Sequence, residues 1–133
     1  MSEDQRHTKP GQEVLREFCR LLRPAGVVRL VVPDAELYLT LYARSRVGGP
    51  VHFPYQEEGD AEVTPLMYVN RVFRDHGHKY AYDFDTLAMM LEQSGFVRIA
   101  RETFGHGRLS ELLIDTESRR RESLYVEAET PAE

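Results

Sequence analysis

One short segment limits the possible folds of this chain more than any other. The run from Val27 to Val32 is almost wholly apolar, rich in β-branched residues, and closed by Pro33. A strand of this kind, without polar alternation, is typical of parallel sheets buried on both faces. From Gln12 to Arg23 the apolar residues recur at helical spacing, and a proline and a glycine follow at once. The sequence therefore predicts a helix and then a buried strand.

The remaining pattern predicts further helices and two further strands. Asp34 stands at the N-cap position of a helix, Thr64 and Pro65 open another, and Asp83 or Asp85 caps a third that ends near Gly95. Residues 96–104 and 123–129 have strand patterns, the second one half-buried, with apolar residues at alternate positions. Two parallel strands joined by a helical crossover, plus one further strand, indicate the α/β class.

Length and charge restrict the class of protein. The 133 residues suit a single domain, for which we expect a flexible lead-in over 1–11, an α/β domain over 12–129 and a tail over 130–133. Lys and Arg number 17 against 22 Asp and Glu, so the net charge is −5 at pH 7, and binding to nucleic acid or to an anionic membrane is disfavoured. With no apolar run near 18 residues, no secretory pattern and one cysteine, the sequence predicts a soluble cytoplasmic protein.

Several motifs resemble one known family in their order and spacing. Residues 21–26 read Leu-Leu-Arg-Pro-Ala-Gly and lead into the strand that ends Val-Pro-Asp at 32–34. This segment resembles the middle of the Rossmann-like S-adenosylmethionine-dependent methyltransferases, in which glycine usually stands at the position of Ala25. Residues 77–96 resemble the helix and strand that follow in that family. Residues 121–128 resemble the last strand of a branch often associated with sugar and cell-envelope pathways.

The resemblance implies a fold, a function and a cofactor. It places the last strand antiparallel between the two parallel strands, giving a small three-stranded mixed sheet with flanking helices, like the C-terminal half of such a methyltransferase. In that family the first half holds S-adenosylmethionine through a glycine-rich turn and an acidic residue. This chain begins after both. Its only G-x-G, from Gly105 to Gly107, comes late and precedes no full helix.

The resemblance therefore implies a truncated, acceptor-side half of a methyltransferase. We expect no binding of S-adenosylmethionine by this chain alone, and activity only with a partner. The alternative is a non-catalytic binding or assembly module derived from the same fold. The apolar strand edge from Val27 to Val32 would lack its neighbour, so we expect a homodimer or a complex with a cofactor-binding chain through that edge.

Three polar segments are expected to meet at one rim and to form an acceptor cleft. They are Asp34, the segment from His76 to Asp83, and the loop 105–110. His78 is the candidate general base, since an unperturbed histidine has a pKa of about 6.5. Its alternative role is a hydrogen bond to the loop backbone. Asp34, His76 and Tyr82 are candidate substrate-binding residues, although Asp34 could instead serve only as a helix cap.

Other candidate groups are given structural interpretations. His76 and His78 with neighbouring aspartates lack further ligands at recognisable spacing, so no metal site is expected. Tyr38 shares a helical face with Tyr42, and we expect both in the core, with a cleft wall as the alternative. The three arginines 119–121 are flanked by two glutamates and are interpreted as a solvated turn.

Overall fold

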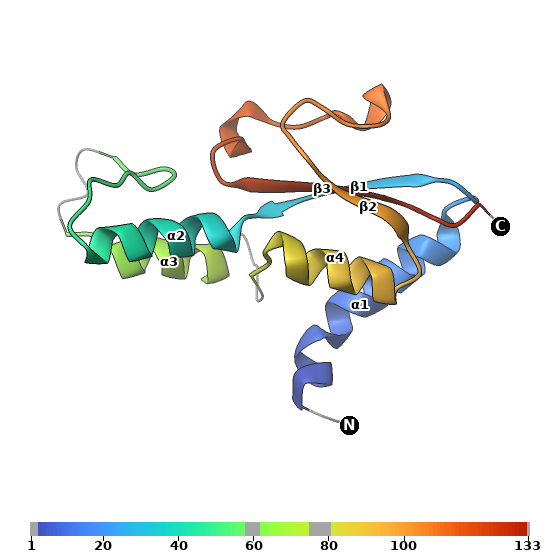
Figure 1. Cartoon of the computed structure of the whole chain (residues 1–133), viewed down its shortest axis with the longest axis horizontal. Helices are drawn as coiled ribbons and strands as arrows, with labels where there is room; N and C mark the ends of the chain where they lie inside the picture. Colours follow the sequence, from blue (N-terminus) through green and yellow to red (C-terminus); the bar gives the residue numbers. More distant parts are fainter. Residues whose placement is uncertain (1–2, 58–61, 75–80, 133) are drawn as a thin grey trace. The chain divides into compact units, whose positions relative to one another are not determined.

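The computed structural model describes residues 3–57, 62–74 and 81–132 (Figure 1). The chain divides into two compact units. Unit 1 comprises Met1–Val31, Phe84–Asp115 and Leu124–Glu133, and unit 2 comprises Val32–Asp83 and Thr116–Ser123. The elements, in chain order, are α1 (Glu3–Leu21), β1 (Val27–Pro33), α2 (Ala35–Arg46), α3 (Pro65–Arg74), α4 (Phe84–Gln93), β2 (Val97–Glu102), the short 3-10 helices η2 (Ser110–Leu112) and η3 (Glu117–Arg119), and β3 (Ser123–Glu129). No helix in these described ranges is long and apolar enough to cross a membrane.

The three strands form one sheet in the order β1-β3-β2. β2 runs antiparallel to β3, with Ala100 opposite Glu127, and all neighbouring strands of the sheet are antiparallel. The predicted mixed sheet with two parallel strands is therefore wrong. β3 lies between β1 and β2 and pairs with both, so neither outer strand has a parallel neighbour. The α/β class and the central place of β3 agree with the structure.

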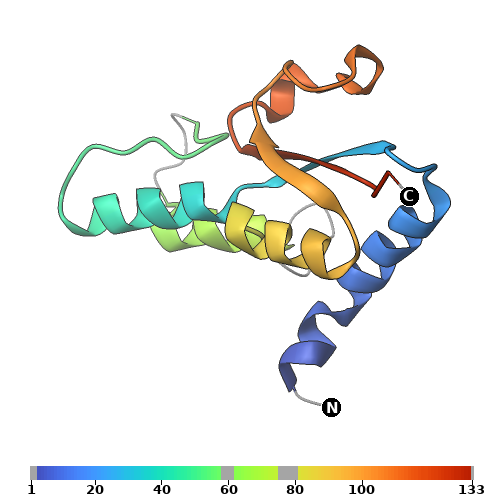
Figure 2. The same ribbon diagram turned by 45° about the vertical axis from the view of Figure 1, so that its right-hand side comes forward.

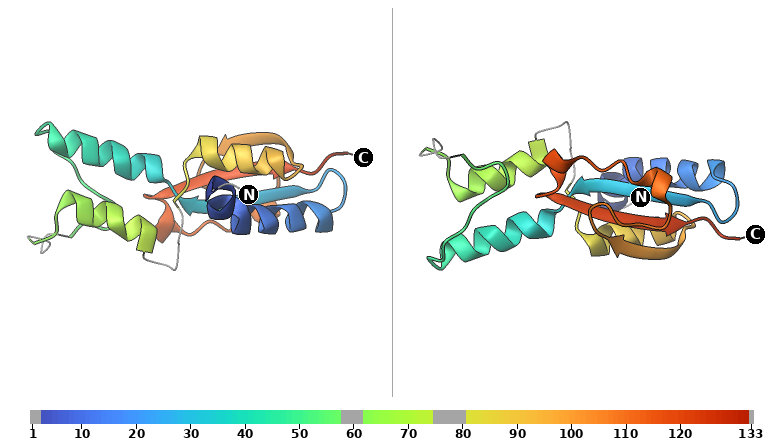
Figure 3. Two further views of the ribbon diagram at one scale, coloured as in Figure 1. Left: turned by 90° about the horizontal axis from the view of Figure 1, so that it is seen from below. Right: turned by 90° about the horizontal axis from the view of Figure 1, so that it is seen from above.

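The burial of the strands follows from this order. The central strand β3 is buried along its middle five residues, including Tyr125 and Glu127 on one face and Val126 on the other. α1 and α4 cover one face of the sheet, and the segment 103–115 covers the other (Figure 3). The prediction of a half-buried last strand is thus wrong. β1, expected to be buried on both faces, is instead a half-buried edge strand whose Val31 is 43% exposed.

In unit 1, apolar residues determine which face of each helix is buried, and one glycine ends α4. α1 begins at Glu3, earlier than the expected Gln12, and contributes Leu15 to the core. α4 buries Leu87, Met90 and Leu91, as its spacing predicts. Gly95 follows with φ +104°, a conformation that favours glycine and turns the chain into β2.

Unit 2 has its own small core, rich in aromatic residues. α2 and α3 lie side by side (Figure 2). The buried residues shared between these helices and the intervening loop are Tyr38, Phe53, Tyr68, Val69 and Val72. The rings of Phe53 and Tyr68 stack at 4.9 Å between centroids, with 9° between their planes. This packing holds the tyrosines of α2 and α3 in fixed positions.

Candidate functional site

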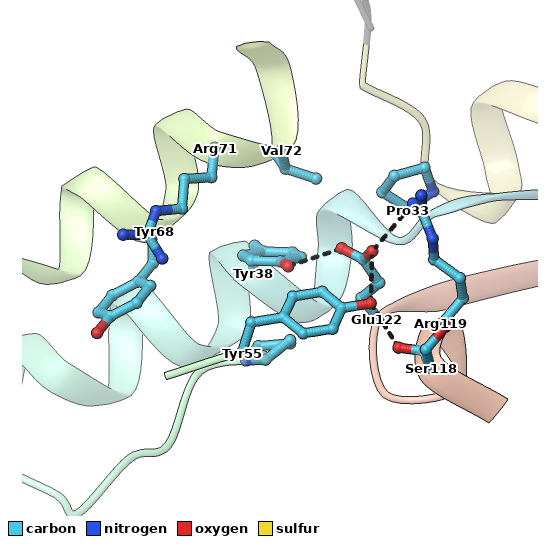
Figure 4. Close-up of a pocket in the computed structure, with 10 residues that line it drawn as sticks. Pro33, Tyr38, Tyr55, Tyr68, Arg71, Val72, Ser118, Arg119 and Glu122 are labelled. Carbon is cyan, nitrogen blue, oxygen red and sulfur yellow. Dashed lines mark hydrogen bonds and ion pairs between the residues drawn. The ribbon is translucent and has the colours of Figure 1, made fainter. Parts of the chain in front are cut away.

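A cavity of about 320 Å³ lies within unit 2 (Figure 4). This volume is at the lower end of the range that small-molecule sites occupy. The walls are mainly aromatic and apolar, with a few charged groups among them. The lining residues are Pro33, Tyr38, Pro54, Tyr55, Tyr68, Arg71, Val72, Ser118, Arg119 and Glu122. They come from the end of β1, from α2, α3 and η3, from the loop between α2 and α3, and from the chain just before β3.

A buried carboxylate lies at one end of the cavity. Glu122 is only 4% exposed. The Tyr38 hydroxyl donates to Glu122 Oε1 at 2.9 Å, and the Tyr55 hydroxyl lies 3.0 Å from Glu122 Oε2. Arg119 Nη1 lies 3.7 Å from the same Oε2. A buried carboxylate requires such partners, because burial without them is very unfavourable.

The Tyr55 hydroxyl has two acceptors but only one hydrogen. Besides Glu122 Oε2, the Ser118 carbonyl oxygen lies 2.7 Å from it. When Tyr55 donates to Ser118, Glu122 Oε2 can accept a hydrogen bond from another donor in the cavity. Tyr55 also has φ +63°, a left-handed conformation that costs a non-glycine residue about 1 kcal/mol or more. The surrounding contacts therefore hold Tyr55 in place against backbone strain.

Arg71 lies at the opposite end of the cavity from Glu122 (Figure 4). Its guanidinium carbon lies 4.9 Å from the centre of the Tyr68 ring. A cation–π contact of this kind uses none of the guanidinium N–H groups as hydrogen-bond donors. Among the residues that the structure describes, the Arg71 side chain forms no ion pair and no hydrogen bond. The cavity thus has a carboxylate end and a guanidinium end, with aromatic walls between them.

Partial shielding of the hydroxyl groups from water affects the proton binding of Tyr38, which is buried, and of Tyr55, which is 41% exposed. Burial raises the pKa of Tyr38 far above its ordinary value, and the hydrogen bond to Glu122 and the repulsion from its charge raise it further. The same causes raise the pKa of Tyr55 above its ordinary value. Both hydroxyls therefore remain neutral donors at any physiological pH.

A spectrophotometric titration can test this environment. Because folding raises the two tyrosine pKa values, their contribution to stability is complete below the unfolded-state pKa of about 10 and is lost as the pH rises above it. We expect part of the tyrosine absorbance change at 295 nm to appear only upon alkaline unfolding, and that part to shrink in Tyr38→Phe. In Glu122→Gln the tyrosine pKa values should fall but stay above the ordinary value, since burial raises them more than Glu122 does. Complete tyrosine ionisation in the folded protein near pH 10 would contradict the buried geometry.

The structure brings together two of the four predicted site residues. Asp34 and Tyr82 form an isolated parallel bridge, and Ala35 N donates to Tyr82 O at 2.9 Å. Asp34 is buried and caps α2, because its Oδ1 accepts from Glu36 N at 3.1 Å. Neither Asp34 nor Tyr82 lines the cavity.

His76 and His78 lie in the segment 75–80, outside the described residues. The general-base role of His78 and the substrate-binding role of His76 therefore stay predictions. Of the residues given structural interpretations, Tyr38 is both buried in the core and part of the cavity wall. At the expected solvated turn 119–121, Arg120 and Arg121 are exposed, and Arg119, whose side chain is 42% exposed, also faces Glu122.

Sequence patterns did not identify the rest of the cavity. Tyr55 lies in a loop without a recognisable motif. Tyr68 lies on a helix whose apolar residues have the usual helical spacing, and Arg71 follows one turn later. Glu122 stands next to three arginines, a pattern that usually marks a solvated surface. The one available signal was the placement of Tyr68 and Arg71 at i and i+3, which allows a ring and a guanidinium to stack on one helix face.

The glycine loop of unit 1 has a structural role. Asp115, just beyond the loop, accepts from the Gly105 backbone N–H at 2.8 Å and from the Arg29 guanidinium, which also contacts Glu127 at 2.9 Å. A Cβ at Gly107 would overlap Glu127 Oε2 and lie 2.9 Å from Arg29 Nη1. Glycine is therefore required at 107 by a buried side chain, and not by the approach of a nucleotide.

This loop does not fit the cofactor that the sequence resemblance implies. A glycine-rich cofactor turn presents its backbone N–H groups to the ligand at the start of a full helix. Here the Gly105 N–H is bound by Asp115, and the three-residue η2 follows. Within the described parts of the chain, no group of three or more metal-ligating side chains is found.

Comparisons with known proteins found no match to this chain among family models, curated proteins or solved structures.

Proposed function

We propose that this chain is the acceptor-side part of a methyltransferase-like protein, and that the cavity of unit 2 holds a small organic acceptor. The observation that carries the proposal is the buried Glu122 carboxylate at the wall of an aromatic cavity. Carboxylates in such positions accept hydrogen bonds and protons from bound hydroxyl groups. The methyltransferase part of the proposal comes from the sequence resemblance.

Glu122 Oε2 is the atom that would receive the acceptor's hydrogen bond. With Tyr55 donating to the Ser118 carbonyl, Oε2 is free to accept from a hydroxyl in the cavity. If the proton moves to Oε2, the new O–H can donate to the Tyr55 oxygen 3.0 Å away. Tyr55 keeps its hydrogen bond to Ser118 in both states. The site therefore accommodates the proton without leaving a buried polar atom unpaired.

One backbone angle supports the resemblance. Ala25 stands where the family usually has glycine, and its φ is +59°. This left-handed conformation favours glycine, so the family residue and the local geometry agree.

S-Adenosylmethionine would have to be held by polypeptide outside the described residues, because the glycine loop of unit 1 is filled by its own ion pairs. Two exposed apolar features of unit 1 suggest where such polypeptide would pack. Val14, Phe18 and Leu21 of α1 are between 41% and 67% exposed, and β1 is an edge strand. Exposed apolar stripes and open strand edges recruit partners. We propose that a cofactor-binding chain, or a second copy, covers this edge in the cytoplasm.

Two binding measurements on the whole chain test this proposal. The neutral phenol p-cresol serves as the acceptor probe, followed by amide shifts in ¹⁵N–¹H NMR spectra. We expect saturable shifts at Tyr38, Tyr55 and Tyr68, weakened several-fold in Glu122→Gln because one charged acceptor is replaced by a neutral one. The isosteric change Glu111→Gln, at an exposed glutamate in η2, is the matched control and should leave binding unchanged.

The second measurement is calorimetry with S-adenosylmethionine alone, for which we expect no detectable heat of binding. Tight binding would overturn the placement of the cofactor site outside this chain. The absence of p-cresol shifts around the cavity would overturn the acceptor site. A third experiment separates the catalytic role from the non-catalytic alternative. If the chain is part of an active enzyme, a bound acceptor becomes methylated once a cofactor-binding partner is added; if the chain is a binding module, it does not.

A further inference from the structure

We propose that the cavity of unit 2 selects an organic anion: a flat, apolar molecule that carries a carboxylate at one end, bound by Arg71, and a hydroxyl at the other, bound by Glu122. This inference rests on the proposed acceptor site and names the chemical class of its ligand. Figure 4 shows Arg71 and Glu122 at separate ends of the cavity, with Tyr38 and Tyr55 between them.

Within the described parts of the chain, the donors of the Arg71 guanidinium are unused. Its central carbon lies over the Tyr68 ring, 4.9 Å from the ring centre, and the guanidinium makes no ion pair or hydrogen bond with a described residue. The Tyr68 ring is itself stacked on Phe53 and is only 3% exposed, so the platform beneath Arg71 is rigid. A guanidinium held over an aromatic ring by a cation–π contact keeps its N–H groups for the fork that binds a carboxylate through two parallel hydrogen bonds.

The charges around the cavity favour an anion. Arg71 and Arg119 carry positive charges, and Glu122 carries the only negative charge among the lining residues. Glu122 is already neutralised in part, because two tyrosine hydroxyls and Arg119 surround it. The adjoining depression, which shares Tyr55 and Ser118, adds Arg120 and Arg121 against the single Glu117. The site therefore has an excess of positive charge, although the whole chain carries −5.

The walls between the two ends suit a flat apolar body. Tyr38, Tyr55, Pro54 and Val72 supply apolar surfaces, and none of them carries a charge. Flat rings pack favourably against such surfaces, and tyrosine rings add offset or edge-on contacts. A ligand with a charge in its middle would lose hydration here without a compensating partner. The ligand's polar groups should therefore lie at its two ends.

The experiment compares two probes that differ by one carboxylate. 4-Hydroxyphenylacetate, which is anionic at neutral pH, and p-cresol, which lacks the carboxylate, are titrated into the full chain by NMR. We expect the anion to bind about tenfold more tightly or better, and to lose that advantage in Arg71→Gln. Arg44→Gln, on the exposed side of α2, is the matched control and should keep the advantage. Amide spectra of each variant verify that the fold is retained.

The outcomes separate this inference from the proposed function. Equal affinity for the two probes, with shifts at the cavity, would overturn the anion preference and leave the acceptor site standing. An anion preference that survives in Arg71→Gln would assign the charge to another residue and would also overturn the inference. Binding of neither probe would overturn both proposals. Loss of the preference in 0.5 M NaCl, with p-cresol binding unchanged, supports the ionic contact with Arg71.

Discussion

Replacing Arg29 by methionine is expected to destabilise unit 1 by about 3–5 kcal/mol. The Arg29 side chain is 2% exposed and uses all five of its N–H groups. Nε and Nη2 donate to the two Asp115 oxygens at 3.0 and 2.6 Å, Nη1 donates to Glu127 at 2.9 Å, and the remaining hydrogens bind the carbonyls of His106 and Thr103. Without the guanidinium, two buried carboxylates lose their counter-charge.

Urea unfolding followed by circular dichroism measures the loss in the free energy of unfolding. In thermal unfolding, the expected fall in Tm is roughly 10–20 °C. Arg98→Met is the matched control, because Arg98 also lies on a strand and pairs with a glutamate, Glu129, at 3.2 Å. Its side chain is 75% exposed, so this pair should contribute at most about 1 kcal/mol. Similar losses for the two variants would show that the buried network does not hold the loop 103–115 in place.

The same network shows why the last strand was misjudged from its sequence. Tyr125 and Glu127 alternate with apolar residues, a pattern that predicts an exposed polar face. Glu127 is instead fully buried, because Arg29 on the neighbouring strand and the Arg108 backbone N–H at 2.8 Å pair with it. A lone arginine within the apolar run of β1 was the available signal. Its partners lie 86 and 98 residues further along the chain, where spacing patterns carry no information.

Local signals, by contrast, predicted local structure well. The N-cap at Asp34 and the glycine that ends α4 are both confirmed, since each depends on residues a few positions apart. The predicted mixed sheet was wrong because the apolar pattern of β1 is typical of parallel sheets, whereas its neighbour in the sheet is the antiparallel strand β3. The cavity escaped prediction because its walls come from six separate segments of unit 2, and only folding brings Tyr55, Arg71 and Glu122 to one place.

Gly107→Ala is expected to destabilise unit 1 by about 2–3 kcal/mol, the second large effect. The new methyl group would overlap Glu127 Oε2 and lie 2.9 Å from both Glu127 Cδ and Arg29 Nη1. A glutamate end group can usually move aside, but both oxygens of this one are held, by Arg29 and by the Arg108 backbone N–H. Gly105→Ala is the control: it strains a φ of +70° with no atom near the new Cβ, and should cost about 1 kcal/mol.

A double-mutant cycle tests whether Arg29→Met and Gly107→Ala both destabilise unit 1 by breaking the contact between Arg29 and Glu127. If Gly107→Ala acts by displacing Glu127 from Arg29, much of its cost should vanish when Arg29 is already methionine, because the contact to be broken is absent. We therefore expect the double variant to be more stable than the sum of the single losses implies, by 1 kcal/mol or more. Gly105→Ala has no atom near its new Cβ and shares with Arg29 only the partner Asp115, so it should couple more weakly to Arg29→Met. Full additivity in both cycles would show that glycine is needed at 107 for a reason other than the buried carboxylate of Glu127.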